Sequence, residues 1–320
     1  MRAFGGPEVL TLEEVPDPAP PSGWVTVRLE ASALNWHDVL VRRGQYSSPL
    51  PHVPGADGTG ARLDTGEPVV VLPSLFWGDR EEAPAPEFEI LGDHRTGTYG
   101  ELVSVPAECV VPRPPGLDVP QAAAFGLVGV TTWRALFSRG RLRSGEWLLV
   151  LGASGGVATY AVSLAVAAGA NVIVTSASPD KVAAARRLGA VDGVDHTSDT
   201  WVEDARALTP KGRGFDLVLD PVGRWAESLR CLRTGGRLLV LGANAASEAT
   251  LQVRPYFFGQ YELIGTTMGS PRDFADLLAF VSSQHVHPPV VDRTFPLDGA
   301  ADAHRHLESG EGFGKVVLVH

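Results

Sequence analysis

Cysteine is nearly absent from this chain of 320 residues, which contains only Cys109 and Cys231. Two cysteines are too few for a disulfide framework, and this scarcity is typical of a reducing compartment. No stretch approaches the roughly 20 consecutive apolar residues that a membrane-spanning helix needs. The segment after Met1 has one arginine but no apolar core, so it does not read as a secretory signal. We therefore expect a cytoplasmic protein with no membrane partner.

Positive charge is also scarce. The chain has 27 lysines and arginines against 37 aspartates and glutamates, a formal net charge of −10. This balance argues against nucleic acid or an anionic membrane as a partner and leaves a small molecule as the expected one. The length predicts about two domains with a sizeable core.

The most informative segment is Trp147–Ala158, an apolar run that enters a glycine-rich turn. A helix of small residues, Thr159–Ala168, follows. Glycines let the backbone approach a pyrophosphate closely, and the start of a helix favours its negative charge. The spacing G-x-x-G-x-x-A is a weaker match than G-x-G-x-x-G, but the required strand, turn and helix are all present. We predict a dinucleotide site at Gly152, Ala153, Ser154, Gly155, Gly156 and Val157.

The chain divides into segments of different texture. Short strands punctuated by proline and glycine mark the first third: Trp24–Glu30, Pro68–Leu72, Tyr99–Val105 and Glu108–Val111. Strands then alternate with helices, as at Trp147–Leu151, Asn171–Thr175, Pro179–Leu188, Phe215–Leu219, Arg224–Leu232 and Arg237–Leu241, with a shorter strand near Val194. This alternation predicts a doubly wound parallel sheet that binds ligand at its carboxyl edge. The predicted fold class is α/β, with a β-rich domain in residues 1–118, a Rossmann domain in 119–254, and the end of its sheet plus a return to the first domain in 255–320.

The end of the strand Asn171–Thr175 bears on the choice of cofactor. An acid at this place would bind the ribose hydroxyls of NAD, and none is present. Ser176, Ser178 and Lys181 instead offer hydrogen-bond donors and positive charge, which suit the 2′-phosphate of NADPH. The alternative interpretation is that the serines only cap the helix that follows. We predict NADPH (NADP) as the cofactor.

Two later strand ends fit the same edge of the sheet. Backbone groups at Gly242, Ala243 and Asn244 are predicted to face the nicotinamide. Asp220 ends a buried strand and is equally well explained as a cap of the next turn.

Several segments together resemble the medium-chain dehydrogenase/reductase superfamily, in particular its zinc-free quinone oxidoreductase branch. They are Ala33–Tyr46, Pro54–Gly60, Gly97–Glu101, the glycine-rich turn, and Gly314–Val317. The resemblance implies a GroES-like β-rich catalytic domain beside the Rossmann domain, with the active site between them. It also implies a homodimer joined through the edges of the Rossmann sheets, near Glu262–Thr266.

The same resemblance bears on zinc. Zinc-using relatives place a cysteine at the position of Asn35, a His-Glu pair at Ala56 and Asp57, and four cysteines between about residues 73 and 98. This chain has none of the cysteines, so we predict no metal site. A different site built on His37, His52 and His94 stays open. The pairs His285/His287 and His304/His306 have a spacing that points their rings apart on a helix, and we predict them at the surface.

Without a metal, an activated acceptor such as a quinone or an α,β-unsaturated carbonyl is the easier substrate for hydride transfer. The predicted catalytic residues are Asn35 and Tyr46, as hydrogen-bond donors to the acceptor oxygen. The final proton comes from Tyr46 or from solvent. The alternatives are that Asn35 only fixes its loop and that Tyr46 only forms a wall. His37 is a further acid in principle, but a lone histidine beside Trp36 is more often a packing residue.

Residues 74–95 replace the zinc lobe with an acidic, proline-rich loop. Its aromatic residues Trp77 and Phe88 either line a substrate channel or, as we favour, anchor the loop. Three other functions stay open. The first is an alcohol dehydrogenase of the same superfamily, which needs a bound metal, and the second is a non-catalytic NADPH-binding protein. The third is a polyketide enoyl-reductase that acts on carrier-bound substrates.

Overall fold

Backbone contacts divide the chain into two units. The computed structural model describes residues 1–243, 245, 246 and 248–320. The first unit comprises Met1–Val130, Gly269–Ser282 and Pro288–His320, and the second comprises Thr131–Met268 and Ser283–His287. Within the described residues, no helix is both long enough and apolar enough to cross a membrane.

The first unit is built on a mostly antiparallel sheet. Its strands lie in the order β14-β15-β1-β2-β3-β7, and β6 also pairs with β1. The strands are β1 (Trp24–Ala33), β2 (Asp57–Arg62), β3 (Pro68–Val71), β6 (Leu102–Pro106), β7 (Val110–Pro112), β14 (Val291–Pro296) and β15 (Lys315–Val319). Strand β15 runs antiparallel to β1 and places Ala33 opposite Val317. The last strand of the chain therefore completes a sheet that the first third begins.

Short helices and a small ribbon surround this sheet. They are η1 (Pro7–Val9), α1 (Trp36–Arg42), β4 (Ser74–Leu75), β5 (Glu89–Ile90), η2 (Ala107–Cys109), α2 (Val119–Ala123), α3 (Gly126–Trp133), α9 (Pro271–Ser283), η5 (Leu297–Gly299) and α10 (Ala300–Ser309). Helix α1 begins after Asn35, which forms a capping box with Asp38. The carboxylate of Asp38 accepts the backbone N–H of Asn35 at 2.8 Å. Helix α2 contacts β1, β2, β14 and β15, so residues 119–130 group with the first unit, whereas the predicted boundary lay after residue 118.

The second unit is built on a parallel sheet in the strand order β10-β9-β8-β11-β12-β13. The strands are β8 (Trp147–Val150), β9 (Asn171–Thr175), β10 (Asp192–Val194), β11 (Phe215–Asp220), β12 (Leu232–Val240) and β13 (Glu262–Gly265). Taken in chain order this is 3-2-1-4-5-6, the order of a dinucleotide-binding sheet. The predicted parallel, doubly wound sheet is confirmed.

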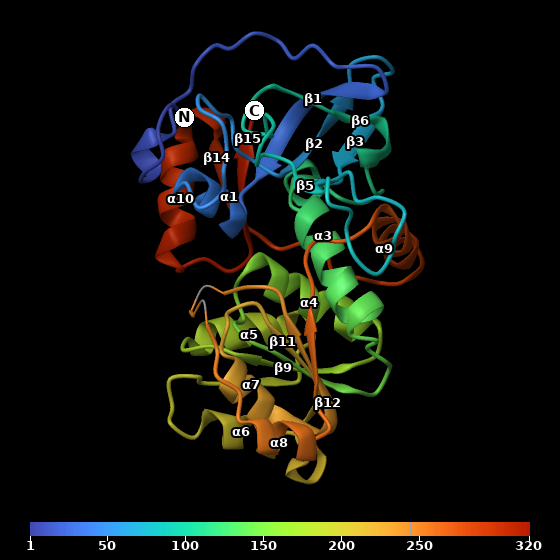
Figure 1. Ribbon diagram of the computed structural model, residues 1–320, viewed down its shortest axis with the longest axis vertical. Coiled ribbons are helices and arrows are strands. Elements are labelled where there is room, and N and C mark those ends of the chain that lie inside the picture. The colour runs from blue at the N-terminus through green and yellow to red at the C-terminus, as the bar shows by residue number, and fades with distance from the viewer. Residues whose placement is uncertain (244, 247) are drawn as a thin grey trace. The chain divides into compact units, whose positions relative to one another are not determined.

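Helices connect these strands and pack against them, as Figure 1 shows for α5 and α7 beside β9, β11 and β12. They are η3, a π-helix (Arg134–Arg139), α4 (Gly156–Ala167), α5 (Pro179–Arg187), α6 (Trp201–Ala207), η4 (Pro210–Gly212), α7 (Trp225–Cys231) and α8 (Val253–Phe258). Strand β11 is buried along its whole length, as expected of a central parallel strand.

Three predicted strand starts were wrong, and the predicted strand Trp24–Glu30 continues to Ala33. Strand β6 begins at Leu102 rather than Tyr99, because Gly97, Thr98 and Tyr99 donate their backbone N–H groups to residues 53–55 instead of to a sheet partner. A 3₁₀ turn occupies the start of the predicted strand Glu108–Val111. Strand β12 begins five residues before Arg237, since its earlier part also pairs with β11. The predicted strand Asn171–Thr175 matches β9 at both ends.

Candidate functional site

The glycine-rich turn joins β8 to α4 in the second unit. Gly152 has a φ of +79°, which favours glycine, and its N–H donates to Thr175 Oγ1 at 3.0 Å. Gly155 has an ordinary φ of −68°, yet a Cβ there would meet no protein atom within 4 Å. Helix α4 starts at Gly156, and its N-cap residue, Gly155, has no side chain to accept the N–H groups of the first turn. Among the described residues, the turn thus leaves open space at Gly155, and the first N–H groups of α4 have no acceptor within the helix; both features fit a pyrophosphate.

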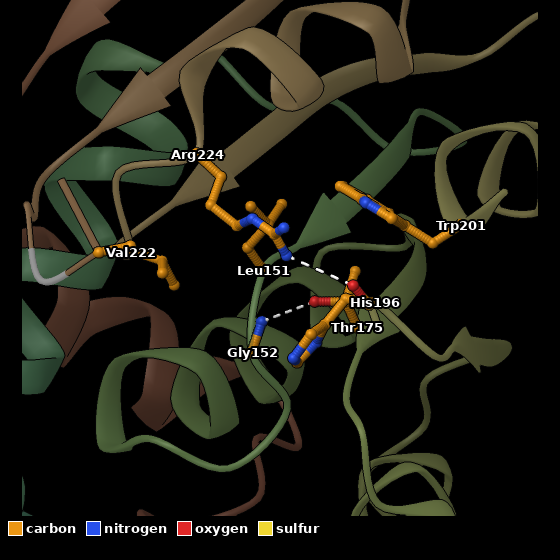
Figure 2. Close-up of a pocket in the computed structure, with 8 residues that line it drawn as sticks. Leu151, Gly152, Thr175, His196, Trp201, Val222 and Arg224 are labelled. Carbon is orange, nitrogen blue, oxygen red and sulfur yellow. Dashed lines mark hydrogen bonds between the residues drawn. The ribbon is translucent and has the colours of Figure 1, made fainter. Parts of the chain in front are cut away.

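A cavity of about 370 Å³ opens beside this turn (Figure 2). Its lining residues come from the carboxyl ends of β8, β9, β10, β11 and β12 and the segments that follow them: Leu151, Gly152, Thr175, His196, Trp201, Val222, Arg224 and Ala245. Strands β8 and β11 are neighbours, and the strand order reverses between them. This is the place where open parallel sheets bind ligands.

Arg224 reaches across this cavity, as Figure 2 shows. Its Nη1 donates to the backbone oxygen of His196 at 3.4 Å, and its Cζ lies 5.7 Å from the ring centre of Trp201. Burial lowers the pKa of His196, and the charge of Arg224 lowers it further. Our sequence analysis missed these three lining residues. They follow the predicted strands near Val194 and at Phe215–Leu219, and residues after the carboxyl ends of parallel strands are expected to face a ligand.

The residues predicted to bind a 2′-phosphate lie between β9 and α5. Ser176 Oγ accepts the N–H of Ser178 at 3.1 Å, and Ser178 Oγ accepts the N–H of Lys181 at 3.4 Å. The capping interpretation is thus correct, but each hydroxyl keeps its own hydrogen to donate to a phosphate. Ser176 also lines a second cavity of about 310 Å³, together with Arg186 and Asp195.

The loops after β11 and β12 are tightly built. A Cβ at Gly242 would lie 2.1 Å from the backbone oxygen of Pro221, so only glycine fits there. Asp220 accepts the N–H groups of Val222 and Gly223 and the hydroxyl of Ser228, which makes it a structural cap. Ala243 is exposed, and Asn244 lies outside the described residues.

In the first unit, Asn35 belongs to a buried network with Asp57 and Lys315. Lys315 Nζ lies 2.5 Å from Asn35 Oδ1 and 3.0 Å from Asp57 Oδ2. The amide nitrogen of Asn35 donates to Asp57 Oδ2 at 3.0 Å and to the backbone oxygen of Ala33 at 3.3 Å. Both amide hydrogens therefore have protein partners. The role of Asn35 as a donor to substrate stays a prediction.

This network decides whether zinc fits at the positions that carry zinc ligands in the zinc-using relatives. The carboxylate of Asp57 already binds Lys315, Asn35 and the N–H of Leu127, and Asn35 directs its amide oxygen to the ammonium group. Among the described residues, no three His, Cys, Asp or Glu side chains are grouped to hold a metal ion. The side-chain ammonium group of Lys315 lies between Asn35 and Asp57, where a zinc site would need ligands. These residues therefore do not fit zinc.

Tyr46, the other predicted catalytic residue, packs against His37. The two ring centres are 4.6 Å apart in an edge-on arrangement, and the side chain of Tyr46 is exposed. His37 Nε2 is hydrogen-bonded to Asp93 Oδ1. Burial alone lowers the pKa of His37, but the hydrogen bond and charge of Asp93 outweigh it, so the pKa is raised. Burial and the charge of Asp93 both raise the pKa of Tyr46.

Behind this pair lies a second buried cluster. Tyr99 Oη lies 3.3 Å from Asp38 Oδ2 and 3.1 Å from His304 Nε2. Burial raises the pKa of Asp38 to about 6, and burial together with the charge of Arg42 lowers the pKa of His304 to about 3. The prediction of His304 at the surface was wrong, because α10 turns this residue toward the sheet. His285 and His287 are exposed, as predicted.

The aromatic residues of the 74–95 loop contact other residues of the same loop. Trp77 is buried, its ring packs edge-on against Phe88, and its Nε1 donates to the backbone oxygen of Arg80. The favoured interpretation, that these aromatic residues anchor the loop to the β-rich domain, stays a prediction. The same loop carries Asp93, the partner of His37.

Both units match known protein families. The family model "Alcohol dehydrogenase GroES-like domain" matches residues 21–115, and "Zinc-binding dehydrogenase" matches residues 156–283. A zinc-type alcohol dehydrogenase-like protein of Schizosaccharomyces pombe is 33% identical, covering 95% of this chain and 93% of that protein. Quinone oxidoreductase of Mus musculus is 30% identical, covering 99% and 95%. A crystal structure described as an NAD-dependent alcohol dehydrogenase is 38% identical and superposes with a TM-score of 0.93, covering 100% of this chain and 98% of that one.

These matches confirm the predicted fold class, a GroES-like β-rich domain plus a Rossmann domain. They name two kinds of oxidoreductase among the relatives, and both are similar to this chain over nearly its whole length.

Proposed function

We propose that this chain, which belongs to the medium-chain dehydrogenase/reductase superfamily of oxidoreductases with nicotinamide cofactors, is a zinc-independent NADPH-dependent reductase of quinones or α,β-unsaturated carbonyl compounds. The observation that carries the proposal is the buried ammonium of Lys315 between Asn35 and Asp57. Asn35 and Asp57, which hold this ammonium group, occupy positions that bind zinc in zinc-dependent relatives. The proposed reaction therefore proceeds without a metal at this place. Acceptors that delocalise the incoming charge meet that requirement.

The choice of NADPH is supported by the groups around the carboxyl edge of the second unit's sheet. None of the described residues that line the larger cavity is acidic, whereas Arg224 brings a positive charge to it. Ser176 and Ser178 retain hydroxyl hydrogens for a phosphate. An acid that would repel a 2′-phosphate is absent from the end of β9.

In the mechanism that follows from this proposal, reduced nicotinamide supplies a hydride to the acceptor. The turn at Gly152–Val157 binds the pyrophosphate through backbone N–H groups at the start of α4. Val222, Trp201 and Arg224, which line the 370 Å³ cavity, would hold the adenosine half of the cofactor. Tyr46, exposed on the first unit, donates a hydrogen bond to the acceptor oxygen.

We extend the proposal to a homodimer through β13, which lies at the edge of the parallel sheet. Unpaired edge strands are ready sites for pairing with a second copy. Phe257 and Phe258 of the neighbouring helix α8 are 51% and 69% exposed, which is unusual for large apolar side chains. Sedimentation analysis of the purified protein tests this assembly, and a monomer at micromolar concentration would contradict it.

The first experiment measures NADPH and NADH oxidation against benzoquinone, naphthoquinone, a 2-alkenal and an enone, with metal content determined on the same sample. We expect turnover without stoichiometric zinc and a higher kcat/KM with NADPH. Firm NADPH binding with no turnover of any acceptor would contradict the proposed reaction. Alcohol oxidation that depends on a bound metal would instead support the alcohol dehydrogenase function named for several relatives.

A further inference from the structure

The first unit contains a histidine–aspartate pair that the proposed function has not used. His37, the second residue of α1, binds Asp93 of the 74–95 loop through Nε2. The residues are 56 positions apart in the chain, so folding alone brings them together. Their side chains are 11% and 9% exposed, and Tyr46, which packs on the imidazole ring, is 37% exposed. His37 thus contacts both a buried carboxylate and a partly exposed phenol ring.

The hydrogen bond to Asp93 defines what the imidazole can do. Since Nε2 contacts the carboxylate, Nδ1 is the nitrogen that points away from it. Within the part of the chain that the structure describes, no hydrogen bond is formed by Nδ1, and it is not among the fully buried unpaired atoms. A carboxylate that fixes one nitrogen of a histidine orients the ring and stabilises the imidazolium form. This is the arrangement of a proton donor.

We propose that His37, positioned by Asp93, is the general acid that protonates the reduced substrate. The inference rests on the proposed function. An enone acceptor receives a hydride at its β-carbon from the reduced nicotinamide, which is thereby oxidised. The resulting enolate takes the proton from His37 Nδ1 at its α-carbon, and the neutral imidazole regains a proton from water. One hydride and one proton are added across the double bond.

Tyr46 is the competing donor, and the electrostatic environment favours His37. The titratable groups acting on His37 are Asp93 and Asp38, both of which raise its pKa against the effect of burial. The same Asp93 charge and burial raise the pKa of Tyr46 above its already high ordinary value. A general acid is most effective when its pKa lies near the working pH. The raised pKa moves the phenol further from that condition, so Tyr46 is left as a hydrogen-bond donor and a wall for the ring.

The test compares two substrates that differ in their need for an acid. We use 1,4-benzoquinone, whose reduced anion is stable in water, and 2-methyl-2-cyclohexen-1-one, whose enolate must be protonated at carbon. His37→Gln should lower kcat for the enone by about 10²- to 10⁴-fold. The kcat for benzoquinone should fall much less than the kcat for the enone, and an unchanged melting temperature shows that the variant is folded. His285→Gln, which removes an exposed histidine, is the matched control.

Two further readouts separate a proton donor from a packing residue. Wild-type activity with the enone should fall as the pH rises through the pKa of His37, because the imidazolium is consumed. Asp93→Asn should move this fall to lower pH, since the charge that raises the pKa is gone. In D2O the wild type should place deuterium on one face of the α-carbon, whereas His37→Gln should give both configurations.

Each result has one meaning. Equal effects of His37→Gln on both substrates, or an unchanged pH profile in Asp93→Asn, would overturn the inference. The inference would also be overturned if Tyr46→Phe lost the stereochemistry of deuterium addition while His37→Gln kept it. A wild type that reduces benzoquinone but not the enone would overturn it as well. In all these cases the proposed function stands. Failure of the wild type with every acceptor would instead contradict the proposed function.

Discussion

Removing the charge of Lys315 should destabilise the first unit strongly. The ammonium group is 4% exposed and Asp57 is fully buried, with 3.0 Å between Nζ and Oδ2. At this distance and an effective dielectric constant of 20, two unit charges attract by about 5 kcal/mol. Lys315→Met keeps most of the volume but leaves the Asp57 carboxylate buried without a counter-ion. Breaking such a pair from one side costs about 3–5 kcal/mol.

The assay is urea unfolding, with hydrogen exchange of peptides from β2 and β15 to localise the loss. Lys315→Met should lower the free energy of unfolding by about 3–5 kcal/mol and open these two strands first. Asp57→Asn should cost a similar amount, because it leaves the ammonium without its anion. The double variant should cost clearly less than the sum, because neither charge then stays buried alone.

The matched control is Arg141→Met, which breaks the ion pair between Arg141 and Glu262. These side chains are 52% and 51% exposed, so water screens the pair and its loss should cost less than about 1 kcal/mol. If Lys315→Met costs no more than this control, or if the two buried substitutions are additive, then Lys315 and Asp57 do not form the coupled pair described above.

Three other predictions concern both units. Gly155→Ala should weaken NADPH binding at least about tenfold while changing the free energy of unfolding by less than about 1 kcal/mol, because its methyl group enters open space; equal binding measured by calorimetry would contradict this. Arg224→Ala should weaken binding of 5′-AMP about 3- to 30-fold, whereas Arg230→Ala, which removes an exposed arginine paired with Glu203, should not. The pKa of His304 is lowered to about 3 in the folded state, so between about pH 6.5 and pH 3 only the unfolded chain binds a proton at this residue. The free energy of unfolding therefore falls as the pH falls through this window, by up to about 1.4 kcal/mol per pH unit. Urea unfolding at pH 7 and pH 5 should show that this loss is smaller in His304→Gln than in the wild type.

The parts of the fold that depend on residues close together in the chain could be predicted from the sequence. Strand β9 was predicted at Asn171–Thr175 because an apolar β-branched run is bounded by polar residues. The glycine turn was identified because its strand and helix adjoin it in the chain. In both cases the decisive interactions span only a few residues.

The parts that depend on distant residues were not readable. Lys315 was noted only as part of a terminal segment, and its partner Asp57 lies 258 positions earlier. The spacing of His304 and His306 correctly implied that their rings point apart, but it holds no information about which face of α10 is covered. His304 is buried for that reason. Asp93 was not singled out, because its role depends on how the 74–95 loop folds back to α1.

The two buried arrangements of the first unit have related consequences. The carboxylate of Asp57 is neutralised by an ammonium ion held in place by the chain itself, so its charge is not offered to a metal. Any negative charge that develops on the substrate must then be dispersed by the substrate's own conjugation or removed as a proton is added. The pair of His37 and Asp93 addresses the second need, on a helix whose first residue follows Asn35 directly. The neutralised carboxylate of Asp57 and the oriented imidazole of His37 therefore fit one chemical requirement.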